Sequence, residues 1–172
     1  MYAVKAHRLY WLIRHWLPPV IWMVLICPFT GDMWSLSGNS RFLIPLLRWL
    51  LPEMPEEQIR SLYLLIRKIG HFIAYFILAW LFLRALRGRS VERWRPDWAL
   101  KAALLTIGYA VFDEVAQSFL PTRTGSVLDV LIDSAGAITA MLITMLYHQR
   151  APVSGWGAGR PALKPSVGEK AR

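Results

Sequence analysis

The chain has 172 residues, of which 55% are hydrophobic and only 18% are charged, and its mean hydropathy is +0.35. A soluble domain is about 45–50% apolar and about 25% charged, so the composition favours lipid as the solvent, and the single cysteine excludes an intramolecular disulfide and a cysteine-rich zinc site. The formal net charge of +9 fits either nucleic-acid binding or the basic cytoplasmic loops of a membrane protein, and the positions of the basic residues must decide between them.

The first apolar stretch begins near Leu9 or Trp16 and ends at Phe29. It is long enough for a bilayer-spanning helix, which needs about 20 mostly apolar residues. Basic residues precede it, as in a signal peptide, but the following CPFTGDMWS offers no cleavage site between small residues. We therefore expect a retained transmembrane helix.

The connection that follows, roughly Thr30 to Arg67, contains two further elements. Phe42 to Leu51 is too short and too interrupted by proline to span a bilayer, and its two apolar clusters predict an interfacial or re-entrant segment. From Pro55 onward we expect a helix, because proline suits the first helical position and Glu56 and Glu57 suit the first turn. This helix can run directly into the second span.

Three more stretches are candidates for membrane helices, namely Ile69 to Leu86, Trp98 to Leu120 and Val127 to His148. Helix is expected because an open strand would leave backbone polar groups unpaired in hydrocarbon. The predicted fold is an all-α integral membrane protein, a bundle of four transmembrane helices plus the interfacial or re-entrant segment between the first two. Residues 1–148 form this domain, and the Gly- and Pro-rich residues 149–172 are expected to be a disordered basic cytoplasmic tail.

The basic residues predict the orientation of the bundle. Most of them lie in the N-terminal segment, in the connection between the second and third spans, and in the tail, and few acidic residues accompany them. Four spans with both termini in the cytoplasm place all of these segments on one side, as the positive-inside rule requires. The positive charge is then a consequence of topology, and we expect no nucleic-acid partner.

Three of the predicted spans carry polar residues at one depth, near the outer surface. On the second span these residues are three and four positions apart, which places them on one helix face. A charge at mid-helix costs about 2.5–3.5 kcal/mol on insertion scales, so such groups are expected to face one another in a shared pocket. The residues assigned to this pocket are Lys68, His71, Tyr75, Asp113, Glu114, Gln117, Arg123, Asp129 and Asp133.

The charges assigned to this pocket are not balanced. Four carboxylates are accompanied by two side chains that are positively charged at neutral pH, Lys68 and Arg123, and by the titratable His71. Close carboxylates cannot all stay ionised without compensation, so a bound proton or cation is expected, as is common at functional sites. A purely structural alternative is that Asp113 and Glu114 pair with the two cations and lock the bundle.

Several of these residues also have simpler explanations. Asp129 lies near the N-terminus of the fourth span, where a negative charge interacts favourably with the helix dipole. The same explanation fits Asp133 less well, because it lies deeper in the span. Gly136 and Ala140 lie on the same face, where close helix packing is a sufficient explanation. No HExxH or EF-hand spacing is present, so we expect no metal and no cofactor. Outward-facing Lys, Arg and His instead suit an anionic headgroup.

At these residues the sequence resembles the VanZ-like membrane protein family. The resemblance lies in RKIGHFIAYFILAW (67–80) and DEVAQSFLPTRTGSVLDVLIDSAGAITA (113–140), within a region from roughly Trp16 to Leu146. It carries over all nine pocket positions and Gly136. Two positions depart from the family pattern, because Arg67 stands where an acidic residue often precedes the lysine, and Ala140 replaces a frequent second glycine.

The resemblance implies the cytoplasmic (inner) membrane of a bacterium as the location. The family is named for a member associated with low-level resistance to the glycopeptide teicoplanin, but most relatives occur without resistance genes, so resistance is not the expected everyday role. Membrane lipids are the expected partners, with a lipid-linked cell-envelope precursor as a further candidate. The sequence does not determine the oligomeric state.

Three functional hypotheses follow. The preferred hypothesis is a non-enzymatic protein that binds an anionic lipid or a lipid-linked wall or polysaccharide precursor. The second is an intramembrane hydrolase or transferase acting on such a lipid, with His71 and Asp113 or Glu114 as acid–base groups. The third is a structural bundle whose buried charges only specify packing.

Overall fold

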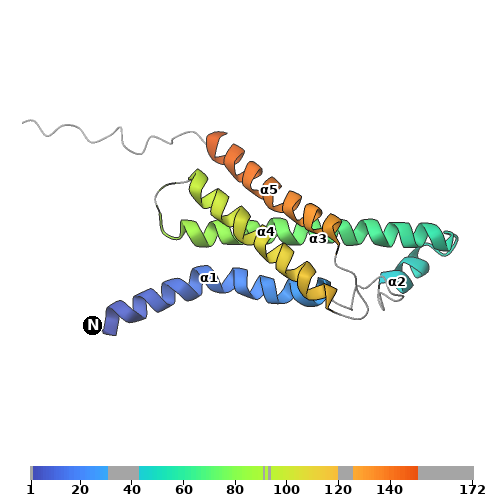
Figure 1. The fold of residues 1–172 in the computed structure, drawn as a ribbon, viewed down its shortest axis with the longest axis horizontal. Coiled ribbons are helices and arrows are strands. Elements are labelled where there is room, and N and C mark those ends of the chain that lie inside the picture. Colours follow the sequence, from blue (N-terminus) through green and yellow to red (C-terminus); the bar gives the residue numbers. More distant parts are fainter. Residues whose placement is uncertain (1, 31–42, 91, 93, 120–125, 151–172) are drawn as a thin grey trace, which may run out of the picture.

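The computed structural model describes residues 2–30, 43–90, 92, 94–119 and 126–150. Within these residues the chain is all helical, as predicted, and contains no strand. The helices, shown in Figure 1, are α1 (Tyr2–Thr30), α2 (Leu43–Leu50), α3 (Glu56–Arg87), α4 (Pro96–Ser118) and α5 (Val127–Arg150). The predicted tail, from residue 151 onward, and Arg123 lie outside the described residues.

Helix α3 is the centre of the structure. It packs against each of the other four helices, and α4 and α5 also pack against one another. Figure 1 shows α3 extending along most of the molecule, with α1 beside its second half and α2 beside its first turns. The largest buried cluster lies where α3, α4 and α5 meet, and it includes Tyr75, Leu78 and Ala79 of α3 with Ala110 and Ala137.

The length of α3 follows from its two ends. It begins directly after Pro55 with Glu56 and Glu57 in its first turn, where negative charge favours the helix dipole, and it ends at Gly88, whose φ of 54° terminates the helix. The predicted helix next to Pro55 continues without a break through residues 69–86, the predicted second span. With 32 residues, α3 is about 48 Å long, which exceeds the roughly 30 Å of a bilayer's hydrocarbon core.

The short helix α2 lies against the first turns of α3. Leu47 is buried against Ile59 and Tyr63, whereas Trp49 on the other side of α2 is 77% exposed. Eight residues span only about 12 Å, so α2 is too short to cross a bilayer. The predicted segment is therefore a helix packed on α3, and its interfacial or re-entrant placement stays a prediction.

The apolar side chains of the bundle face outward to an unusual extent. Val24, Ile73, Phe112 and Leu131, one from each long helix, are half or more exposed, while carboxylates such as Asp133 are buried. This distribution is typical of a protein whose solvent is lipid. Among the described residues, two helices are long and apolar enough to cross a membrane, α3 and residues Val127–Gln149 of α5, so the four-span bundle is supported in part.

Helices α3 and α5 approach closely at Gly136. A Cβ atom placed on Gly136 would lie 2.4 Å from the carbonyl oxygen of Phe72, so only glycine fits here without a shift of one backbone. Ala137 and Ala140 beside it are fully buried. The small residues Gly136 and Ala140, for which close helix packing was expected, thus lie at the α3–α5 contact. This contact also brings together the polar residues that precede Phe72 on α3 and Gly136 on α5.

Candidate functional site

The close helix crossing places His71 of α3 beside Asp133 of α5. The His71 Nδ1 atom lies 3.3 Å from Asp133 Oδ1, and the two side chains are 7% and 1% exposed. An ionised carboxylate only accepts hydrogen bonds, so His71 donates from Nδ1, and its other nitrogen, Nε2, is left for a further partner. Nε2 and Asp133 Oδ2 are both buried and have no hydrogen-bond partner among the described residues.

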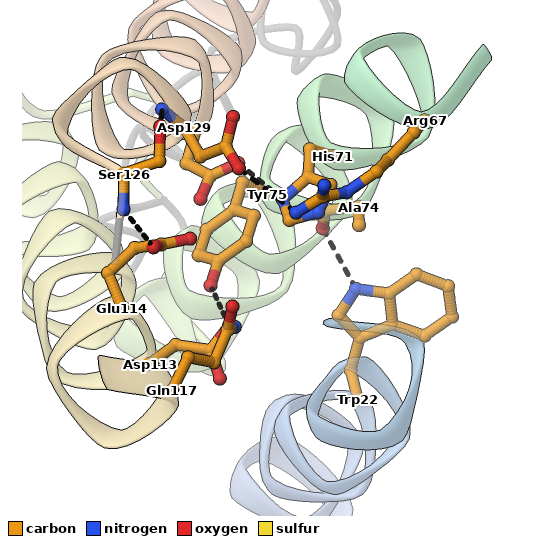
Figure 2. Close-up of polar contacts among 11 residues, drawn as sticks. Trp22, Arg67, His71, Ala74, Tyr75, Asp113, Glu114, Gln117, Ser126 and Asp129 are labelled. Atoms are coloured by element: carbon orange, nitrogen blue, oxygen red, sulfur yellow. Dashed lines mark hydrogen bonds and ion pairs between the residues drawn. The ribbon is translucent and has the colours of Figure 1, made fainter. Parts of the chain in front are cut away.

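Asp113 is held from α3 and from its own helix. The hydroxyl of Tyr75 donates to Asp113 Oδ2 at 3.2 Å, and Gln117, one turn further along α4, donates to the same oxygen at 2.8 Å. Figure 2 shows Tyr75 projecting from α3 toward this pair. Tyr75 is fully buried. These contacts explain why a tyrosine and a glutamine accompany the aspartate on helices that face one another.

Glu114 binds the start of α5. Its Oε2 atom accepts a hydrogen bond of 2.7 Å from the backbone N–H of Ser126, and the Ser126 hydroxyl accepts one from the N–H of Asp129. Ser126 therefore caps α5. The Ser126-x-x-Asp129 spacing before an apolar run is a helix-start pattern that could have predicted this cap. Glu114 Oε1 is buried and has no partner among the described residues.

Among the described residues, the cation that pairs with these carboxylates is Arg67. It donates to Asp129 Oδ2 at 3.1 Å, and both side chains are 13% exposed (Figure 2). Lys68, which the sequence analysis assigned to the pocket, is exposed on α3. A spacing signal for the arginine exists in the sequence, since Arg67, His71 and Tyr75 recur every four residues and therefore share a helix face.

The nine predicted pocket residues thus divide into three groups. Arg123 lies outside the described residues, and Lys68 lies at the surface. The other seven form one cluster of hydrogen-bonded groups from α3, α4 and α5, which also includes Arg67 and Ser126, and we refer to it as the His71 cluster. Its predicted members are His71, Tyr75, Asp113, Glu114, Gln117, Asp129 and Asp133.

A pocket of about 490 Å³ opens beside the His71 cluster, between α1 and α3. Trp22, Leu25 and Ile26 line it from α1, Arg67 and His71 are among the residues that line it from α3, and its walls are mostly apolar. The indole N–H of Trp22 donates to the carbonyl of Ala74 at 2.9 Å and ties α1 to α3. Sequence reasoning placed no residue of the first span at the site, because α1 carries no charged residue in this region.

Several buried polar atoms of the His71 cluster have no hydrogen-bond partner among the described residues. Each buried polar group without a hydrogen bond costs about 1–3 kcal/mol, so such atoms call for a partner beyond the residues that the structure describes. The described residues contain no group of three or more His, Cys, Asp or Glu side chains that could hold a metal ion. The unpartnered atoms are Arg67 Nε, His71 Nε2, Glu114 Oε1 and Asp133 Oδ2.

Comparison with known proteins identifies a family. The VanZ/LLP1 family model matches residues 16–148, which is most of the chain and includes every residue of the His71 cluster. No curated protein and no solved structure matches the chain.

Proposed function

The chain belongs to the VanZ/LLP1 family, as its resemblance predicted, and from this premise we propose that it is a multi-pass membrane protein that binds an anionic lipid. The ligand is a membrane lipid, or a lipid-linked cell-envelope precursor, that carries a phosphate or carboxylate group. Its charged group binds at Arg67 and His71, and its hydrocarbon chain lies between α1 and α3.

The observation that carries this proposal is the combination of an apolar pocket with buried donors at one part of its wall. Arg67 binds Asp129 through its Nη2 atom, and its Nε atom has no hydrogen-bond partner among the described residues. His71 binds Asp133 through Nδ1, and its Nε2 atom likewise has no partner there. Both residues line the pocket. Charge-assisted hydrogen bonds from arginine, and from histidine that carries a proton on both nitrogens, favour anionic oxygens. The apolar walls favour hydrocarbon, so the pocket suits an amphipathic anion.

The membrane placement extends the same proposal. The family, the outward-facing apolar side chains and the two apolar helices support a membrane protein. We propose that α1 and α4 also cross the membrane and that both termini lie in the cytoplasm, which places the His71 cluster near the extracytoplasmic surface. An envelope precursor is accessible from that surface. The association with glycopeptide resistance stays an expectation from the family resemblance.

Lipid retention by purified protein tests the proposal. The chain and its Arg67→Ala and Lys68→Ala variants are extracted in mild detergent, and the co-purifying lipids are measured by native mass spectrometry. Removing a charge-assisted contact should lower affinity by about tenfold to hundredfold, so Arg67→Ala should lose the bound anionic lipid. Lys68→Ala removes the same charge at the neighbouring exposed position and should retain it.

Two results would reject the binding proposal. One is recovery of the unaltered protein without any anionic lipid. The other is an equal loss of lipid from the Arg67 and Lys68 variants, which would indicate attraction by surface charge alone. If Arg67→Ala yields no folded protein, Arg67→Lys, which keeps the positive charge, should fold and retain part of the lipid.

A second candidate function, an intramembrane hydrolase or transferase, is favoured by the geometry of His71. Asp133 holds one ring nitrogen, and the other is available to take a proton from a nucleophile at a substrate in the pocket. Of the other acid–base candidates, Asp113 binds Tyr75 and Gln117, and Glu114 binds the Ser126 N–H. Release of phosphate or headgroup from a defined lipid, lowered by His71→Gln far more than lipid retention is lowered, would establish turnover. Retention without any product would favour simple binding.

A further inference from the structure

A second pocket, of about 320 Å³, lies at the opposite end of the bundle from the His71 cluster. It is formed where α3 and α5 end and α4 begins, an end that Figure 1 shows on the side of the N-terminus. Arg84 lies thirteen residues beyond His71 on α3, which corresponds to about 20 Å along the helix axis. None of the residues around this pocket takes part in the proposed lipid site. Its principal lining residues are Trp80, Arg84, Arg87, Trp94, Trp98 and His148.

The two arginines of this pocket carry charge that nearby acids do not neutralise. Arg84 and Arg87 are three residues apart and therefore neighbours on the surface of α3. The local acids are engaged elsewhere, since Glu92 and Asp97 pair with Arg95, and Asp97 also pairs with Lys101. No ion pair within the described residues includes Arg84 or Arg87. His148 of α5 lines the same pocket.

Three tryptophans form much of the remaining wall. Trp80, Trp94 and Trp98 line the pocket together with the buried Leu83, and the guanidinium of Arg95 lies over the Trp98 ring at 5.1 Å. Tryptophan is favoured at the level of lipid headgroups because one part of its ring is apolar and the other donates a hydrogen bond. The pocket therefore offers cationic and apolar surfaces side by side.

Gly88, at the end of α3, brings α1 to the edge of the pocket. Gly88 lines the pocket with a φ of 54°, and a Cβ atom there would lie 2.9 Å from the ring of Trp11 in α1. Packing of Trp11 against this turn means that α1, α3, α4 and α5 all contribute to this end of the bundle. Arginines in the last turn of α3 favour the helix dipole, but the dipole alone does not require three tryptophans or a cavity.

We infer that this pocket is a second lipid site, which binds the phosphate group of an anionic phospholipid in the membrane leaflet opposite the His71 cluster. Arg84 and Arg87 bind the phosphate oxygens, and the tryptophans contact the glycerol and the first carbons of the chains. Basic pockets between transmembrane helices are a known type of headgroup site on the cytoplasmic side of membranes, the side on which the predicted topology places this end.

Binding of short-chain phosphatidylglycerol to the delipidated full-length protein tests the inference. Native mass spectrometry gives the affinity for the unaltered chain and for two charge-matched pairs of substitutions. Arg84→Gln with Arg87→Gln should weaken binding by at least about tenfold. Arg14→Gln with Arg89→Gln removes the same charge from exposed positions and should change the affinity less than about twofold.

Three results would overturn the second site. Equal losses from both pairs would show that surface charge alone attracts the lipid, and no loss from either pair would show that the pocket is not used. Competition by inorganic phosphate at the affinity of the lipid would assign the pocket to a free anion. If the glutamine pair fails to fold, Arg84→Lys with Arg87→Lys keeps the charge and should still bind. Because Arg67 is intact in all these proteins, failure here leaves the first lipid site untouched.

Discussion

Tyr75 shows how a single hydroxyl connects two helices inside the bundle. Its ring is fully buried among apolar neighbours, yet its oxygen donates to Asp113 across the α3–α4 contact. A buried carboxylate requires such donors, because the desolvation of a charged group is compensated only by hydrogen bonds or opposite charge. The polar residues of α3 and α4 are therefore matched to one another at the level of single atoms.

Replacing Tyr75 by phenylalanine should destabilise the protein while keeping the ring. The loss of one donor to the buried Asp113 is expected to lower the free energy of unfolding by about 0.5–2 kcal/mol. Thermal unfolding in detergent measures the change. Tyr147→Phe is the matched control, since that ring is 71% exposed and its hydroxyl removal should leave the melting temperature unchanged. A Tyr75→Phe protein as stable as the original would contradict the role of this hydrogen bond.

At the scale of elements, the α3–α5 crossing positions the site. Gly136 allows the backbone of α5 to touch the carbonyl of Phe72, and one turn before it on α5 lies Asp133, opposite His71. The crossing distance therefore controls whether the histidine and the aspartate can bond. α1 contributes separately, through hydrogen bonds from Trp22 to Ala74 and from Tyr109 of α4 to Met23.

Gly136→Ala should force the two helices apart. The added methyl group would meet a backbone oxygen that cannot rotate away, so we expect a loss of about 1–3 kcal/mol in stability together with weaker retention of the anionic lipid. Thermal unfolding and native mass spectrometry measure the two effects. Gly108→Ala is the control, because nothing lies within 4 Å of its added Cβ, and alanine there should be neutral or should stabilise α4 by up to about 1 kcal/mol. Identical behaviour of the two variants would rule out a tight crossing.

At the scale of the whole molecule, the ends of the helices lie at two opposite ends of the bundle. Trp11 of α1, the end of α3, the start of α4 and the end of α5 lie at one end of the bundle, where Trp11 lies against Gly88 and His148 lines the pocket of Arg84. The His71 cluster lies toward the other end. This arrangement supports the predicted topology, in which both termini lie on the basic side of the membrane.

Reporter fusions test that topology directly. Green fluorescent protein fused to either terminus should fluoresce, and alkaline phosphatase inserted after Gly125 should be active, because that reporter works only outside the cytoplasm. Phosphatase fused after Arg150 is the reciprocal control and should be inactive. Active phosphatase at Arg150 would show that the number of crossings is odd or that the orientation is reversed.

The sequence by itself determined the elements and the chemical character of the site. Apolar length and the Pro55–Glu56–Glu57 start predicted a continuous α3, and the small residues Gly136 and Ala140 predicted a close contact. These features are local, since helix ends and close approach depend on residues within one or two turns. The residue types of the polar cluster were likewise readable, because charges inside apolar helices must find partners.

Only the tertiary structure decided which side chains meet. Arg67 and Lys68 are adjacent in sequence and point about 100° apart around α3, and the packing of α5 on one side of that helix brings the arginine to Asp129. Periodicity could not make this choice, because α3 has neighbours on several sides and so shows no single apolar face. The pairing of Glu114 with the Ser126 N–H and the wall that α1 adds to the pocket depend in the same way on the rotation and contact of whole helices.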